Sequence, residues 1–174
     1  MEDEITYKGN RDPRFVTISR GGLLDDQTHR KLALWAADCA EHVLRLFNEK
    51  YPDDKRPEIA IEKARAWARN EITMTQAREA AYAAHAAAKD TNGSASMAAR
   101  AAGHAVATAH MADHELGAAA YAIKAVKEAS TVTERDNAGK KEKEWQRSTL
   151  SEEIKELVLS DQRNRNKKLW SLFY

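Results

Sequence analysis

Residues 95–126, ASMAARAAGHAVATAHMADHELGAAAYAIKAV, decide the fold of this 174-residue chain. Alanine fills more than a third of the positions between residues 60 and 129, and it has the highest helix propensity of any residue. Gly103 and Gly117 lie inside this stretch, where each glycine costs a helix about 0.5–1 kcal/mol relative to alanine. Because helices faced with small side chains can approach closely, to about 8 Å, we expect close interhelical contacts at both glycines.

Tryptophan, tyrosine and isoleucine recur at helical spacing through the same region, which argues against low-complexity disorder. The pattern predicts helices over residues 57–70, 73–89, 95–112 and 114–130. Thr73 and Gln76 have the spacing of a capping box, Pro57 suits a first helical turn, and Asp113 could cap the last of these helices. The centre of the molecule is therefore expected to be an alanine-rich helical bundle.

Two amphipathic segments flank this centre. The first begins after an N-cap at Asp25 or Asp26, ends at residues 51–54 (YPDD), and places one apolar stripe along a helix. Its members are Leu32, Trp35, Ala36, Cys39, Ala40, Val43, Leu46 and Phe47. The second carries Leu150, Ile154, Leu157 and Val158. Residues 131–144, which connect the alanine-rich centre to the second stripe, are a charged connector or an exposed helix start. Asp161 either caps a last short helix or lies within a continuous one.

The two ends of the chain differ in character. Residues 1–24 are polar and read as an extended strap in which residues 15–18 (FVTI) could form a short strand. Residues 169–174 (LWSLFY) are aromatic and should dock on their own bundle or on another chain. The whole pattern predicts an all-α fold, a compact single domain of about six or seven helices over residues 25–174 that follows the strap.

Composition excludes several classes of protein. The net charge of +1 gives no global field for nucleic acid, and the hydrophobic fraction of 43% includes no run long enough to span a membrane. Cys39 is the single cysteine, so it can form no internal disulfide, and within its apolar stripe it should act as a small buried hydrophobe. The first residues, MEDEITYK, lack the apolar core of a signal peptide. We therefore expect a cytoplasmic protein without nucleic-acid or membrane partners.

Three stretches carry a family resemblance. They are residues 16–42, with VTISRGG and WAADCAEH; residues 99–125, with ARAAGHAVATAH and AAYAIKA; and residues 154–171, with IKELVLSDQ. The chain resembles bacterial immunity proteins of polymorphic toxin systems, the immunity-five-like helical domain, over nearly its whole length. The resemblance implies a partner, a cognate protein toxin, and implies no catalytic residues. Ala112 and Ser151 stand where that family often has proline, and both positions lie at predicted helix junctions.

His110, Asp113 and His114 form the pattern H-x-x-D-H. On an unbroken helix these residues would share a face, and two imidazoles with a carboxylate can bind zinc or another divalent metal. If the helix breaks near residue 112, Asp113 is only a cap and the two histidines diverge. We regard the second interpretation as the stronger one and expect no metal and no other cofactor.

Five further residues are candidates for a polar site or an interface: His29, Asp38, His42, Arg165 and Trp170. Asp38 and His42 are four residues apart on one helix, where an interhelical polar contact is the simpler interpretation and a catalytic dyad would need a nucleophile and a pocket. Arg165 and Trp170 belong to a basic and aromatic end of the chain that favours a solvated helix face over nucleic-acid binding.

Two hypotheses about function follow. The first is an immunity protein, not an enzyme, that neutralises a toxin by steric occlusion through a few anchoring side chains. The alternative is a small metal- or ligand-binding helical enzyme whose site would draw on the histidines: His29, His42, His85, His104, His110 and His114. A homodimer with residues 170–174 at its seam is a third arrangement. Convergence of four or more histidines on one pocket with bound metal would favour the enzyme.

Overall fold

Local chemistry sets the starts of three helices in the computed structural model, which describes residues 11–174. The Asp25 carboxylate accepts a hydrogen bond from the Thr28 backbone N–H at 2.7 Å and begins α1 (Asp26–Val43). Pro57 lies in the first turn of α3 (Arg56–Ala68). The Thr73–Gln76 capping box forms and begins α4 (Met74–Lys89). These three starts confirm the predictions made from sequence.

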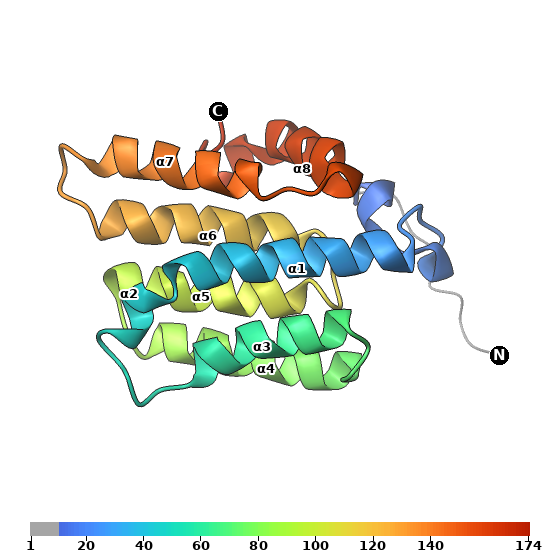
Figure 1. Cartoon of the computed structure of the whole chain (residues 1–174), viewed down its shortest axis with the longest axis horizontal. Coiled ribbons are helices and arrows are strands. Elements are labelled where there is room, and N and C mark those ends of the chain that lie inside the picture. The colour runs from blue at the N-terminus through green and yellow to red at the C-terminus, as the bar shows by residue number, and fades with distance from the viewer. Residues whose placement is uncertain (1–10) are drawn as a thin grey trace.

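The remaining helices complete an all-α bundle, as predicted (Figure 1). They are α2 (Arg45–Asn48), α5 (Gly93–Ala107), α6 (His114–Glu128), α7 (Arg135–Ser148) and α8 (Glu152–Arg165). Residues 11–174 contain no β-strand, only one isolated bridge between Thr17 and Leu24. Most of the charged segment 131–144 therefore belongs to a helix, and Asp161 lies inside α8 rather than at a cap.

The short strand considered for residues 15–18 is not formed. Two 3-10 turns, η1 (Pro13–Phe15) and η2 (Ile18–Arg20), occupy this part of the chain. Asp12 caps η1 and Pro13 fixes its first turn, which favours a tight turn over an extended segment. The first ten residues of the predicted strap lie outside the described residues, and a boundary at residue 24 stays a prediction.

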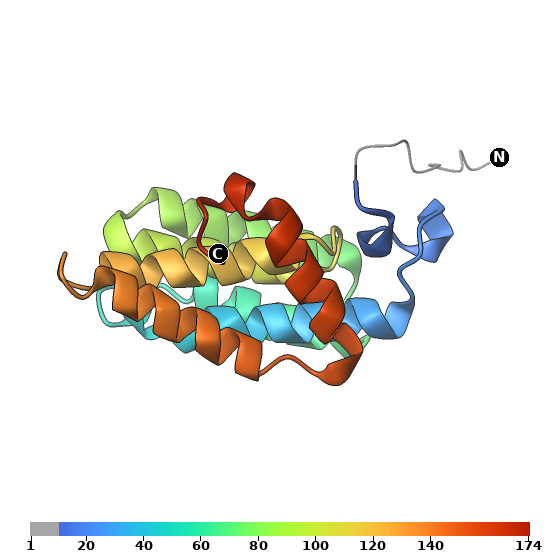
Figure 2. The same cartoon turned by 90° about the horizontal axis from the view of Figure 1, so that it is seen from above.

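Helix α5 occupies the centre of the bundle, where it packs against α1, α2, α3, α4 and α6. Alanine side chains make up most of this core, so the helices lie close together. A second core lies between α1, α6 and α8, and its largest side chains are Phe15, Trp35, Leu116, Ile123 and Phe173. Figure 2 shows α8 crossing the other helices obliquely. The aromatic end of the chain docks on its own bundle, because Phe173 is completely buried there.

The largest departure from the predicted helices lies between α5 and α6. The predicted helix over 95–112 ends early, at Ala107. The N–H groups of Ala109 and His110 bond to carbonyls three residues back, so the chain tightens into a turn directly after α5. The Thr108 carbonyl in this turn accepts a hydrogen bond from Nε2 of His29 at 2.6 Å, which ties the turn to α1. None of the helices in residues 11–174 combines the length and the apolar character that crossing a bilayer requires.

Candidate functional site

The two interior glycines make room for histidine rings. A Cβ atom on Gly103 would lie 2.7 Å from Nε2 of His85, and one on Gly117 would lie 2.5 Å from Nδ1 of His104. The ring of His85 on α4 thus lies against α5, and the ring of His104 on α5 lies against α6. The predicted close contacts at both glycines are confirmed, although the neighbours are imidazoles rather than helix backbones.

These imidazoles belong to a continuous set of ring contacts across three helices. The rings of His85 and His104 meet edge to face with centroids 5.3 Å apart, and His104 stacks on Tyr121 of α6 at 5.1 Å. Tyr121 in turn meets Trp170 at 5.4 Å. We call His85, His104, Tyr121 and Trp170 the ring cluster. It joins α4, α5, α6 and the C-terminal segment on one side of the bundle.

Cationic side chains border the ring cluster. Nη1 of Arg100 donates a hydrogen bond to Nδ1 of His85 at 3.1 Å. Nζ of Lys124 lies 3.7 Å from the centroid of the Trp170 ring, a cation–π contact. Trp170 and Ser171 both have positive φ, 58° and 55°, a conformation that is uncommon outside glycine. The C-terminal backbone therefore adopts a strained path at the point where the indole meets Tyr121 and Lys124.

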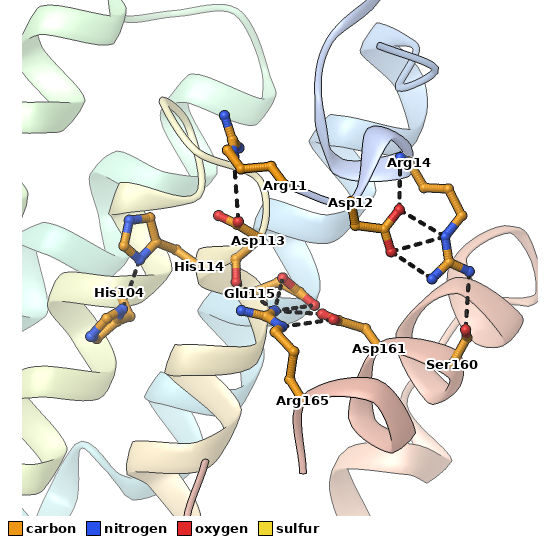
Figure 3. A network of polar contacts seen from close by, with 10 residues as sticks. All are labelled: Arg11, Asp12, Arg14, His104, Asp113, His114, Glu115, Ser160, Asp161 and Arg165. Atoms are coloured by element: carbon orange, nitrogen blue, oxygen red, sulfur yellow. Dashed lines mark hydrogen bonds and ion pairs between the residues drawn. The ribbon is translucent and has the colours of Figure 1, made fainter. Parts of the chain in front are cut away.

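Two more histidines extend the cluster toward the α5–α6 turn. Nδ1 of His104 and Nδ1 of His114 lie 2.9 Å apart, so one ring donates a hydrogen bond to the other (Figure 3). The ring of His110 lies 5.6 Å from that of His114. Such a bond requires an unprotonated nitrogen on the accepting ring, which links the geometry to the charge state of the histidines.

Burial keeps these rings neutral. Desolvation lowers the pKa of His104 to about 3, and the neighbouring His114 and His85 lower it further. Desolvation also lowers the pKa of His85 to about 4, with Arg100 adding to the effect, and it lowers the pKa of His110 to about 4. The pKa of His114 falls for the same reason, partly offset by Asp113. At neutral pH the cluster therefore offers uncharged rings between fixed cations.

A buried acid–arginine group supports the other side of α6 (Figure 3). Arg165 on α8 donates a hydrogen bond from Nε to the Asp161 carboxyl at 2.7 Å and another from Nη2 to the Asp113 backbone carbonyl at 2.8 Å. The same Nη2 lies 3.5 Å from the Glu115 carboxyl. Glu115 is completely buried, and burial together with Asp161 raises its pKa, which favours a protonated carboxyl. Arg165 thus fastens the start of α6 to α8, a structural role.

The N-terminal segment is held against the same end of the bundle. Arg14 pairs with Asp12 and donates a hydrogen bond to Oγ of Ser160 on α8 at 3.0 Å. Arg11 forms an ion pair with Asp113 at 3.6 Å. These contacts fix the turn that carries His110 and His114 relative to α8.

His29 lies apart from the ring cluster, on the α1 side of the α5–α6 turn. Its ring meets Trp67 at 4.6 Å and borders a cavity of about 190 Å³ that His110 and Arg20 also line. Its pKa is lowered, chiefly by burial. The hydrogen bond from His29 to Thr108 gives this residue a structural role in holding the turn after α5.

Asp38 and His42 do not pair with each other. Asp38 accepts a hydrogen bond from Nη2 of Arg65 on α3 at 2.9 Å. His42 donates from Nδ1 to Glu142 on α7 and stacks on Trp145 with centroids 3.5 Å apart, at one wall of a groove of about 600 Å³. The simpler interpretation, interhelical polar contacts, is confirmed for both residues. The five candidates from sequence thus do not converge on one place: His29, the pair Asp38 and His42, Arg165, and Trp170 lie apart.

Residues 22–153 match the family described as Imm-5 like putative immunity protein. The chain belongs to this family. The match covers His85, His104 and Tyr121 of the ring cluster and ends before Arg165 and Trp170. Comparison with curated proteins found no match, and comparison with solved structures found none.

In this member of the Imm-5-like family, the H-x-x-D-H pattern does not lie on one helix. Its residues span the turn before α6, where Asp113 occupies the N-cap position without a capping hydrogen bond and pairs with Arg11 instead. The described residues 11–174 include no group of three or more His, Cys, Asp or Glu side chains placed to hold a metal ion. Cys39 is fully buried and burial raises the pKa of its thiol, as expected of a small hydrophobe.

Sequence reasoning did not name Arg100, Tyr121 or Lys124 as candidate site residues. The signal was available in the spacing of residues that are neither alanine nor glycine. Arg100 and His104 are four apart on α5, and His114, Tyr121 and Lys124 are seven and three apart on α6, so each set shares one helical face. In a helix otherwise filled with alanine, such a set marks the side that is left outside the core.

Proposed function

We propose that this protein is a bacterial immunity protein that binds one cognate toxin in the cytoplasm and neutralises it by steric occlusion. Membership of the Imm-5-like family over residues 22–153 carries the proposal. Occlusion requires a rigid body with a few anchoring side chains and needs no reacting group on the protein.

The distribution of side chains supports a binding role. The alanine-rich core holds α3, α4, α5 and α6 close together, which limits the conformational entropy that association would cost. Tyr82 and Trp170 are 67% and 49% exposed, respectively, although both are residue types enriched among interface anchors. A rigid scaffold that exposes such anchors can block a toxin surface without rearranging.

A toxicity-rescue assay tests the proposal. The tagged chain is expressed in its native host, the partner that co-purifies with it is identified, and that partner is expressed in a sensitive bacterium with and without the chain. We expect growth to stop with the partner alone and to recover when both are expressed, with a stable complex by size-exclusion chromatography. A partner that stays equally toxic in the presence of the chain, or one that is harmless alone, would contradict the proposal.

One observation favours the alternative, a metal- or ligand-binding protein that uses histidines. Four of the six histidines, at positions 85, 104, 110 and 114, lie in successive ring contacts. Metal analysis of protein purified without chelators separates the two functions. Stoichiometric metal that is lost in His104→Gln would favour the alternative, whereas metal-free protein that still rescues growth would leave toxin binding as the function.

A further inference from the structure

Resting on the proposed function, we propose that the toxin binds the side of the bundle that carries the ring cluster, and that it presents an acidic protein surface there. We call this side the cationic face. It consists of the ring cluster together with Arg78, Tyr82, Lys89, Arg100 and Lys124. Nothing in the family assignment specifies a binding surface.

Helix α5 shows which side of the bundle is free. Neighbouring helices cover α5 on every side but one. After Gly93, all side chains of α5 are buried except those of Met97, Arg100 and His104, which are partly exposed. These residues are three and four apart, so they form one stripe along the helix. The stripe is the centre line of the cationic face.

Helix α4 forms one flank of the face. Arg78, Tyr82, His85 and Lys89 are four, three and four residues apart and therefore share a side of α4. Since the His85 ring lies against Gly103 of α5, this side of α4 adjoins the α5 stripe. Tyr82 is the most exposed aromatic residue on it. Aromatic and cationic side chains thus continue from α5 onto α4.

Helix α6 and the C-terminal segment form the other flank. Tyr121 contacts His104, and Trp170 lies over both Tyr121 and Lys124. Helix α5 packs against both α4 and α6 and lies between them in Figure 1. The face is therefore one continuous surface, joined by contacts from His85 to Lys124.

The charge of this face differs from that of the whole molecule. Arg78, Lys89, Arg100 and Lys124 form no ion pair with any other residue in the described range 11–174, so no nearby carboxylate neutralises them through a direct contact. Glu128, one turn beyond Lys124, is the carboxylate nearest along α6 on this side. These four cations outnumber the carboxylates beside them, Glu128 on α6 and the exposed Glu79 on α4, so this side carries a net positive charge.

The lowered pKa values of two neighbouring histidines are consistent with this positive potential. Arg78 helps to lower the pKa of His110, and Arg100 and Lys89 help to lower the pKa of His85. Unpaired cations around exposed aromatic rings favour carboxylates at the contact, because complementary potentials speed association and exclude wrong partners. The occupant that fits is an acidic toxin surface into which Tyr82 and Trp170 pack.

The decisive experiment compares two charge-reversed variants that change the net charge equally. Arg78→Glu/Lys89→Glu alters the cationic face, whereas Lys140→Glu/Lys155→Glu alters exposed residues of α7 and α8. Affinity for the toxin identified by rescue is measured by calorimetry at two salt concentrations. We expect at least about a tenfold loss for the first variant, no more than about twofold for the second, and a weaker salt dependence in the first. Tyr82→Ala should also lose about tenfold.

The outcomes separate the two proposals. If wild-type protein rescues growth and Arg78→Glu/Lys89→Glu binds the toxin like the control variant, the surface is wrong and the immunity function stands. If no toxin is recovered, the immunity function fails, and a short poly-glutamate peptide followed by NMR then tests the face alone. Chemical-shift changes centred on Arg100 and Lys124 would support the surface, whereas changes elsewhere, or tighter binding of a single-stranded oligonucleotide, would overturn it.

Discussion

Gly117 is the residue at which helix propensity and packing conflict most directly. Alanine would favour α6 by about 1 kcal/mol, but its Cβ would lie 2.5 Å from Nδ1 of His104. The His104 ring is held by Tyr121 and His114 and cannot move freely. We therefore expect Gly117→Ala to lower the free energy of unfolding by about 1–3 kcal/mol, measured by urea denaturation.

A double-mutant cycle isolates the cause of that loss. In a His104→Ala background the clash is absent, so Gly117→Ala should become neutral or stabilising. The same loss in both backgrounds would show that the glycine is needed for some reason other than the imidazole.

Arg165 offers a second single-residue test, because it is the cation paired with the buried carboxyl of Asp161. Its removal leaves Asp161 without that cation in an apolar setting. We expect Arg165→Leu to reduce the free energy of unfolding by about 3 kcal/mol, since an unpaired buried charge is costly. Arg163→Leu, at an exposed position on the same helix, is the matched control and should change stability by less than about 0.5 kcal/mol. Equal effects would place the importance of α8 elsewhere.

Among the elements, the C-terminal segment is the one whose partner was left open by sequence. Phe173 is fully buried in the core between α1, α6 and α8, whereas Tyr174 is 58% exposed. Phe173→Ala should therefore cost about 3–5 kcal/mol in chemical denaturation, and Tyr174→Ala should cost less than about 1 kcal/mol. A negligible effect of Phe173→Ala would contradict docking on the chain's own bundle.

The same segment was also considered as the seam of a homodimer. Removing residues 169–174 and measuring the mass by light scattering tests that arrangement. Because Phe173 fills the chain's own core, we expect the intact and the shortened chain to have the same oligomeric state, with the shortened chain less stable. A change from dimer to monomer on removal would support the seam.

Helix starts and helix ends differ in how well sequence predicts them. Asp25 and Thr73 begin their helices through bonds to residues three positions away, so a short window of sequence contains the whole cause. The end of α5 has no such local cause, because residues 108–112 include no glycine or proline. The turn that follows α5 is held by His29, 79 residues away, which donates a hydrogen bond to the Thr108 carbonyl.

At the scale of the whole molecule, sequence predicted the bundle but not the site. The alanine stretch and the two amphipathic stripes follow from periodicity, which is local information. The ring cluster depends on which faces of α4, α5 and α6 adjoin, and no pattern within a single helix determines that. Arg165 and Trp170 were recognised as polar or aromatic candidates, yet their partners, Asp161 and Tyr121, emerge only from the packing of α8 and the C-terminal segment on α6.

Neutral imidazoles in the bundle make the stability of the whole molecule depend on pH. The pKa values of His85, His104 and His110 lie at about 4, 3 and 4 in the folded protein, against 6.5 for an unperturbed histidine. Between pH 6.5 and about 4 the unfolded chain binds more protons than the folded one, so stability falls as pH falls. We expect the urea midpoint to drop progressively over this range. Asp12 and Asp54 have pKa values below their ordinary value of 3.8 in the folded protein. Their protonation therefore adds to the loss of stability below pH 3.8, at the acid end of this range.

Glu115 acts in the opposite direction, and this makes the prediction specific. The pKa of Glu115 is raised by burial, so above pH 4.5 the folded protein retains a proton that the unfolded chain has lost. The contribution of Glu115 therefore stabilises the folded protein as pH falls. Glu115→Gln should therefore steepen the acid-side loss. His104→Gln should flatten it, because one neutral ring no longer has to be protonated on unfolding. Stability that stays constant or rises from pH 6.5 to 4.5, or a slope that His104→Gln leaves unchanged, would show that the imidazoles are charged in the folded protein.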